Sequence, residues 1–131
     1  MWMLDTSICI DAMRHRRAAL QKKFLQVGVE HIAISTVVLA ELYYGSARYP
    51  QRPDFRREID TFIRPIQVVS WDGHAADAYG HIRADLERRG LVSGSNDMMI
   101  AAHALSENAI LVTNNVIHFA SVPGLKLENW L

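Results

Sequence analysis

The chain has 131 residues, of which 50% are hydrophobic and 21% are charged, the composition of a globular domain rather than of a disordered or collagen-like chain. Its 14 basic and 14 acidic residues give a formal net charge of zero, so no overall field favours binding to nucleic acid. A single cysteine excludes an internal disulfide, and no apolar run approaches the roughly 18 residues needed to cross a membrane. We therefore expect one cytoplasmic domain over residues 1–131, with no membrane segment.

Short apolar runs alternate along the chain with helical patterns. We expect strands at residues 2–5, 31–35, 66–70 and 109–114, and an edge strand at 125–130. We expect helices at residues 7–14, 17–27, 35–45, 54–64, 73–89 and 93–108. This alternation predicts an α/β fold in three layers, with a central, mainly parallel sheet flanked by helices.

Several residues are predicted to mark helix ends. Ser35 is expected to cap the third helix, Gly45 to end it, and Gly90 to end the helix at 73–89. Ser95 or Asn96 is expected to cap the helix at 93–108. Cys9, within the apolar sequence ICI, is expected to be a small buried hydrophobic residue.

The basic residues are mostly arginine, with 11 Arg and 3 Lys. Residues 14–23 contain five positive charges and no acid, and a second arginine-rich segment follows at 48–64. Such segments are ordinary solvated helix faces or, because the guanidinium group suits phosphate, the rim of a polyanion site. The sequence leaves both interpretations open.

Three acids lie in apolar surroundings: Asp5 in WMLDTSICI, Glu41 in STVVLAELYYGS and Asp97 in SNDMMIAA. No Lys or Arg lies within six residues of Glu41. Burying an unpaired carboxylate costs several kcal/mol. Asp5 follows a predicted strand, and Glu41 and Asp97 are expected in the first turns of helices, so all three are predicted near the carboxyl ends of the strands, where such sheets bind ligands. A divalent cation would compensate their charge, and all-oxygen ligands favour Mg²⁺ or Mn²⁺ over zinc.

Each acid also has an ordinary interpretation. Asp5 could be a turn residue, Glu41 could pair with a distant arginine, and Asp97 could stabilise a helix N-terminus. Two other classes of protein are also compatible with clustered acids on a parallel sheet. A phosphoryl-accepting receiver-like domain would need paired N-terminal acids and a well-placed lysine, whereas Asp5 stands alone and Lys126 is poorly placed. The other is an interaction module without strong catalysis.

Four segments resemble the PIN-domain ribonucleases and, within them, the VapC toxins of toxin–antitoxin pairs. They occur in the family's order: DTSICID (5–11), STVVLAELYYGS (35–46), HIRADLERRGLVSGSNDMMIAAHAL (81–105) and ILVTNNVIHFASVPGLKLENW (110–130). The similarity covers essentially the whole chain. The resemblance implies a PIN-like fold and an endoribonuclease that uses Mg²⁺ or Mn²⁺. The alternative is a catalytically weak PIN-fold module.

The resemblance also assigns residues to the site. Asp5, Glu41 and Asp97 match the family's acidic metal ligands, and Asn115 in TNN matches a supporting position. Thr6 and Thr113 match hydroxyl residues that line the same pocket.

Two positions depart from the family pattern. Ser7 stands where an amide is frequent, and His118 stands where relatives often carry an acid. We expect His118 to be a surface residue, with a phosphate contact as the alternative.

Further implications of the resemblance concern partners. A VapB-like antitoxin is expected to wrap the domain, to place a basic side chain near the acids, and to carry any binding to operator DNA. Its groove is expected around Leu42, Tyr43, Tyr44, Phe55 and Phe62. A homodimer is expected, with structured RNA as substrate and a tRNA anticodon loop favoured.

Overall fold

A computed structural model describes residues 1–15, 17–91 and 93–131. Five parallel strands form its single described sheet, in the order β3-β2-β1-β4-β5. The strands are β1 (Trp2–Leu4), β2 (Ile32–Ser35), β3 (Gln67–Val69), β4 (Ile110–Val112) and β5 (Lys126–Glu128). The predicted parallel sheet is confirmed, and β5 is at an edge as expected.

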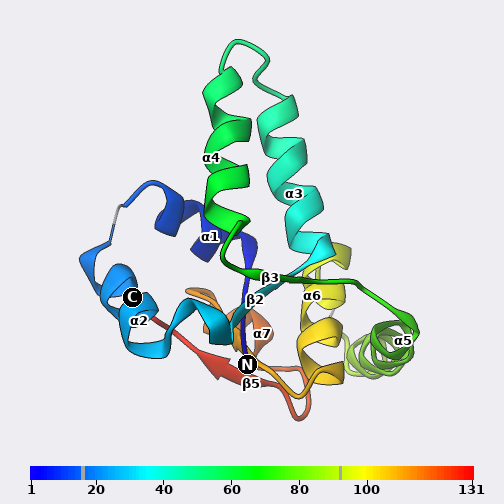
Figure 1. Ribbon diagram of the computed structural model, residues 1–131. Helices are drawn as coiled ribbons and strands as arrows, with labels where there is room; N and C mark the ends of the chain where they lie inside the picture. Colours follow the sequence, from blue (N-terminus) through cyan, green and yellow to red (C-terminus); the bar gives the residue numbers. More distant parts are fainter. Residues whose placement is uncertain (16, 92) are drawn as a thin grey trace.

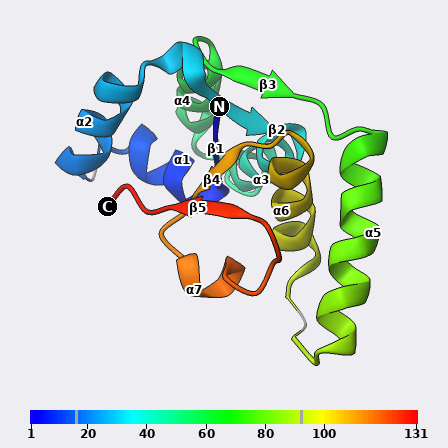
Figure 2. The ribbon, with the colours of Figure 1, turned by 90° about the horizontal axis from the view of Figure 1, so that it is seen from below.

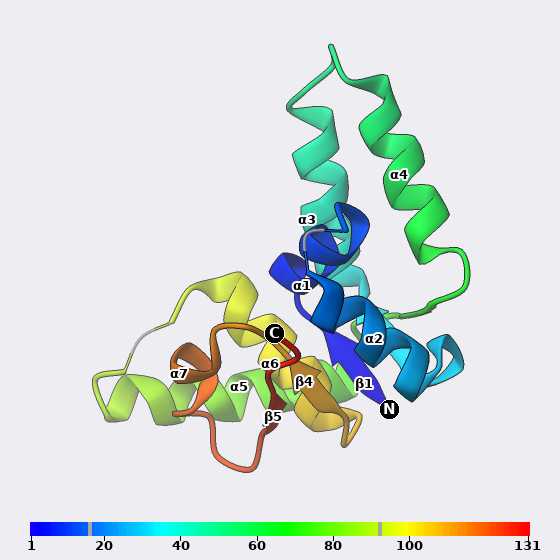
Figure 3. The ribbon, with the colours of Figure 1, turned by 90° about the vertical axis from the view of Figure 1, so that its left-hand side faces the viewer.

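Helices cover both faces of this sheet. In chain order they are α1 (Thr6–Met13), α2 (Ala18–Val27), α3 (Thr36–Ala47), α4 (Pro53–Ile63), α5 (Gly73–Arg88), α6 (Ser95–Ser106) and α7 (Val116–Phe119), with a 3₁₀ helix at Val29–His31. Figure 2 shows α5 and α6 side by side on one face of the sheet and α1 and α2 on the other. The α3–α4 pair projects away from the rest of the domain (Figures 1 and 3). The three-layer α/β prediction is therefore confirmed.

The central strands are buried because apolar helix faces pack against them. The four residues of β2 are all buried, and Met3 of β1 lies opposite Ala33 of β2 and Leu111 of β4. Cys9 is also fully buried, as expected. This packing fixes the carboxyl ends of β2, β1 and β4 side by side, which determines where the side chains that follow them lie.

Three expectations about the helices are wrong. Helix α3 continues through Gly45 to Ala47, because a glycine in an open position weakens a helix without ending it. Because α3 begins at Thr36, Glu41 is its sixth residue and lies in the second turn rather than in the first. Helix α6 begins after Gly94 and has no side-chain cap, so neither Ser95 nor Asn96 caps it. The caps expected from Ser35 and Gly90 are present, with Gly90 at a φ of 70°.

Two short elements were not predicted, the 3₁₀ helix at Val29–His31 and α7. Four residues are too few to show a helical period, and Ile117 of α7 is 89% exposed, which removes the amphipathic signal. Two of the five residues expected to line a partner groove belong to the core instead, because Leu42 and Phe55 are 1% and 5% exposed. Within the described ranges, no helix has the length and apolar character to cross a membrane.

Candidate functional site

Asp5 lies directly after β1, at the middle of the sheet edge. Its backbone N–H donates to the carbonyl of Val112 at 3.1 Å, which holds the end of β1 against β4. Its side chain caps α1, with Oδ1 accepting from the N–H of Ile8 at 2.9 Å. The residue is only 7% exposed. The sequence folds this way because an aspartate between a strand and a helix satisfies an otherwise unpaired amide.

Burial raises the pKa of the Asp5 carboxyl above its usual value. Hydrogen bonds from the Thr113 hydroxyl and the Ile8 amide oppose that rise, whereas the negative charges of Asp97 and Glu41 add to it. Among the described residues, no lysine or arginine forms an ion pair with Asp5 or Glu41. Within the described ranges, the buried carboxylate of Asp5 therefore has no cationic partner.

Glu41 faces Asp5 from the neighbouring helix. Thr6, the first residue of α1, donates its hydroxyl to Glu41 Oε1 at 2.6 Å. Because Thr6 directly follows Asp5, this bond links the carboxylate of α3 to the end of β1. The predicted proximity of Thr6 to the acids is thus present as a direct contact.

Asp97 is in the first turn of α6, as predicted, where the positive end of the helix dipole favours a carboxylate. Its Oδ2 lies 2.8 Å from Nε2 of His118. The two side chains are 44% and 34% exposed. His118 is partly exposed, and α7 places its ring against α6 in contact with Asp97, a contact that the sequence did not predict.

Thr113 and Asn115 follow β4, on the other side of Asp5. Thr113 is fully buried, and its Oγ1 accepts from the N–H of Asn115 at 3.0 Å. Hydrogen bonding by Thr113 is also one of the influences that lower the pKa of the Asp5 carboxyl, so the two side chains are close. Asn115 is exposed at the start of α7, and its side chain caps no amide there. The structure therefore brings Thr113 to Asp5 and leaves the side chain of Asn115 at the rim.

One further pair fixes the helices that carry the acids, and sequence reasoning did not connect it. Ser35, at the end of β2, caps α3 through a 3.1 Å bond from the N–H of Val37. Its hydroxyl also lies 2.7 Å from Nδ1 of His103 on α6. Both residues are buried, so the bond joins the α3 of Glu41 to the α6 of Asp97 in the core.

The donor chemistry of this edge fits a hard divalent cation. Three carboxylates and a buried hydroxyl supply oxygen atoms, and Asp5 lacks any cation among the described side chains to offset its burial. In the described part of the chain, however, no three His, Cys, Asp or Glu side chains are grouped closely enough to hold a metal ion as they stand. Thr6 bonds Glu41 and His118 contacts Asp97, so two of the three carboxylates are directed to neighbouring residues.

Comparison with known proteins decides the family. A profile for the PIN domain matches residues 2–125. The chain is 39% identical to Ribonuclease VapC2 of Rickettsia felis over 130 residues, which is 98% of this chain and 97% of the relative. This chain belongs to the PIN-domain family of VapC proteins. A tRNA(fMet)-specific endonuclease VapC of Shigella flexneri is also 39% identical, over 98% of this chain and 97% of its own length.

Solved VapC structures have the same fold. The toxin chain of DNA-bound VapBC from Salmonella typhimurium superposes with a TM-score of 0.94 at 34% identity, over 99% of this chain and 98% of that one. VapBC2 of Rickettsia felis, bound to a DNA fragment from its promoter, gives 0.93 at 36% identity with the same coverage. The resemblance inferred from the motifs is therefore confirmed at the level of family and fold.

Proposed function

We propose that this VapC chain is an endoribonuclease that depends on Mg²⁺ or Mn²⁺ and acts as the toxin of a toxin–antitoxin pair. The observation that carries the proposal is Asp5, a buried carboxylate with a raised pKa, flanked by two acids and without a cationic partner among the described residues. The names of the relatives, ribonuclease and tRNA(fMet)-specific endonuclease, support RNA as the substrate.

In this proposal Asp5, Glu41 and Asp97 hold the cation, with Asn115 in support. A bound divalent metal would supply an activated water and neutralise charge on the phosphate oxygens. The residues of the chain set the geometry. Thr6 orients Glu41, Thr113 orients Asp5, and buried strand ends keep these groups on a rigid frame. Metal binding would require Asp97 to exchange its contact with His118 for the cation.

The direct test is an RNase assay with purified protein. Asp5→Asn, Glu41→Gln and Asp97→Asn should each lower cleavage at least 100-fold in Mg²⁺ or Mn²⁺, and EDTA should abolish it. Asp77→Asn is the matched control, because that carboxylate is 80% exposed on α5 and its loss changes the charge equally. If the three site variants cleave RNA as well as the Asp77 control, the assignment is wrong.

The RNA target is proposed to be a tRNA, cut in the anticodon loop. The support is that the relatives from Shigella flexneri and Salmonella typhimurium are both named tRNA(fMet)-specific endonucleases. Sequencing of RNA ends after induced expression would show new ends within one tRNA species. Ends distributed over messenger RNA would overturn the tRNA proposal while leaving ribonuclease activity intact.

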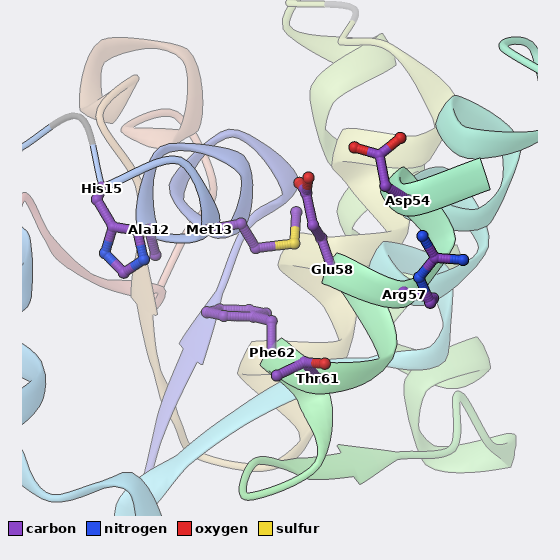
Figure 4. A pocket seen from close by; sticks show the side chains of 8 residues that line it. All are labelled: Ala12, Met13, His15, Asp54, Arg57, Glu58, Thr61 and Phe62. Carbon is purple, nitrogen blue, oxygen red and sulfur yellow. The ribbon is translucent and has the colours of Figure 1, made fainter. Parts of the chain in front are cut away.

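A VapB-like antitoxin is the proposed protein partner, supported by the solved VapBC complexes, two of which contain DNA. Figure 4 shows Met13 and Phe62 pointing into a hollow between α1 and α4, with Glu58 and Asp54 at its rim. The hollow has a volume of ≈ 490 Å³ and adjoins a second of ≈ 310 Å³ beside Leu25, which is 87% exposed.

An apolar segment would fit the side chains of Met13 and Phe62, so we place the antitoxin in this hollow. Any binding to operator DNA would take place through the antitoxin. A homodimer of the toxin in the cytoplasm completes the proposal. Co-expression with a candidate VapB-like antitoxin, followed by purification and light scattering, would test the complex. Recovery of the toxin alone would contradict it.

A catalytically weak interaction module is the second candidate. The contact of His118 with Asp97 favours it, because a histidine occupies one of the three carboxylates. The same RNase assay separates the two candidates. Antitoxin binding without metal-dependent cleavage would support the module.

A further inference from the structure

A groove leads outward from the candidate site along α3. It has a volume of ≈ 600 Å³, with Thr6 and Glu41 in its lining at the sheet edge and Tyr44 and Arg48 farther along the helix. Asn96 and Met99 of α6 also line it. Glu41, Tyr44 and Arg48 are spaced three and four residues apart, so they share one face of α3. At 1.5 Å per residue they span about 10 Å of the helix.

The outer part of the groove carries an exposed aromatic ring beside a cation. Tyr44 is 64% exposed, and the Arg48 guanidinium lies 4.9 Å from its ring centroid and 5.5 Å from that of Tyr49. Exposed aromatic rings with adjacent arginines are the usual means by which proteins bind unpaired bases, since every base has a face to stack.

Unlike Arg52 and Arg56 of the α3–α4 hairpin, Arg48 forms no ion pair among the described residues. Arg57 forms none there either, but it lines the hollow between α1 and α4 instead of this groove. Arg52 pairs with Asp54 at 3.4 Å and with Glu58 at 3.7 Å, and Arg56 pairs with Asp60 at 3.2 Å. Among residues 1–15, 17–91 and 93–131, no carboxylate forms an ion pair with Arg48. Its guanidinium group is therefore available to a phosphate that lies in the groove.

The negative and positive charges lie at opposite ends of the groove. Carboxylates lie at the sheet end and a free guanidinium lies at the hairpin end. A polyanion would be attracted at the outer end and would meet the acids only at the inner end, where the proposed cation would offset repulsion. A flexible single strand of RNA can follow this path along α3.

We propose that Tyr44 and Arg48 form a platform for single-stranded RNA next to the cleavage site. The ring of Tyr44 stacks on a base close to the scissile bond, and Arg48 contacts the phosphate of that nucleotide. The proposal rests on the proposed ribonuclease function and adds a residue pair that determines how the substrate is held. Tyr44 and Arg48 bind the RNA in this proposal, while Asp5, Glu41 and Asp97 serve the cleavage step.

The test measures RNA binding and cleavage separately. Binding of a fluorescein-labelled 12-nucleotide single-stranded RNA is followed by fluorescence anisotropy in EDTA, where cleavage is prevented. Tyr44→Ala should weaken binding about 10-fold, while Tyr44→Phe should retain it, because a stacked base contributes roughly 1–3 kcal/mol and needs only the ring. In Mg²⁺, Tyr44→Ala should raise KM by a similar factor and leave kcat within about twofold.

Arg48→Gln should weaken binding and lower the slope of log Kd against log salt concentration by about 0.7, the value for one phosphate contact on a single strand. Arg57→Gln is the matched control. It removes the same charge from the same hairpin, but Arg57 lines the hollow between α1 and α4 rather than this groove. Its binding and salt slope should equal those of the wild type.

The outcomes are distinguishable. If the wild type cleaves RNA and Tyr44→Ala binds and cleaves normally, the platform is wrong and the proposed function stands. If the wild type binds RNA through Tyr44 and Arg48 but does not cleave it, the platform stands and the ribonuclease proposal fails. Equal losses in Arg48→Gln and Arg57→Gln would show a general charge effect and overturn the platform. A changed sedimentation coefficient with unchanged RNA affinity would assign the groove to a second copy of the chain and also overturn it.

Discussion

Nε2 of His118 lies 2.8 Å from Oδ2 of Asp97, so a histidine from α7 contacts a carboxylate proposed to bind metal. Both side chains are partly exposed, and the contact connects two segments 21 residues apart in the sequence. The family resemblance implies an acid at this position. Where that pattern would supply a fourth oxygen ligand, this chain has a histidine in contact with Asp97.

Replacing His118 by glutamate should strengthen metal binding. The variant loses the contact with Asp97 and gains a carboxylate, so in EDTA its free energy of unfolding should fall by about 1 kcal/mol from like-charge repulsion. Thermal unfolding with increasing Mg²⁺ should then show a larger rise in Tm than for the wild type, because the ion binds only the folded chain. His118→Asn separates loss of the histidine from gain of the acid. If Mg²⁺ raises the Tm of His118→Glu no more than that of the wild type, His118 does not compete with the cation for Asp97.

Asp5→Asn should stabilise the protein without metal. Asparagine also caps a helix, so the bond to the Ile8 amide is retained while the buried charge is removed. Because the folded pKa of Asp5 is raised, the folded state binds more protons, and the wild type should lose stability as pH rises from about 4 through that pKa. In urea unfolding with EDTA, the free energy of unfolding should fall less between pH 4 and pH 8 for Asp5→Asn than for the wild type. Asp5→Ala, which also removes the cap, should lack the net gain.

The bond between Thr6 and Glu41 predicts a role for a single hydroxyl. Thr6→Val keeps the shape of the side chain but leaves Glu41 Oε1 without its 2.6 Å donor. We expect cleavage to fall about 10-fold as Glu41 loses its fixed orientation. Thr6→Ser should retain activity, since it keeps the hydroxyl. Steady-state cleavage rates of the two variants test this, and equal activity in both would remove Thr6 from the site.

The buried pair Ser35 and His103 should control stability. Ser35→Ala removes the cap of α3 and leaves Nδ1 of His103 unpaired, with an expected cost of about 2–3 kcal/mol by chemical denaturation. Ser35→Thr, which keeps an oxygen, should cost less. A loss below 0.5 kcal/mol, on the scale of ordinary surface changes, would show that the bond contributes little.

Burial also gives the protein a histidine-dependent response to acid. Desolvation lowers the pKa of His103, against the opposing charges of Glu107 and Asp72. The unfolded state then binds more protons, so stability should fall as pH drops below about 6.5, the pKa of an unfolded histidine. The free energies of unfolding of the wild type and of His103→Gln should be compared at pH 7.5 and 5.5. The difference between the two proteins gives the contribution of His103, because Asp5 is present in both. An identical pH response in the two proteins would rule it out.

Much of this protein follows from its sequence. The alternation of apolar runs and helical periods determined the parallel sheet, and the isolation of Asp5, Glu41 and Asp97 from basic residues marked the candidate site. These features depend on local chemistry: strand burial, an aspartate after a strand, and a carboxylate without a nearby partner. The extent of α3 past Gly45 and the existence of α7 escaped prediction, because a glycine only weakens a helix and four residues show no period.

Only the tertiary structure decided which distant groups meet. The contacts of His118 with Asp97, Thr6 with Glu41 and His103 with Ser35 join residues 21, 35 and 68 positions apart. No local pattern encodes such pairs, since each depends on how helices pack after the strands have ordered. The sequence by itself determined that the acids at the sheet edge need a partner. Packing decided that, without metal, two of them use a threonine and a histidine, while Asp5 remains buried with a raised pKa.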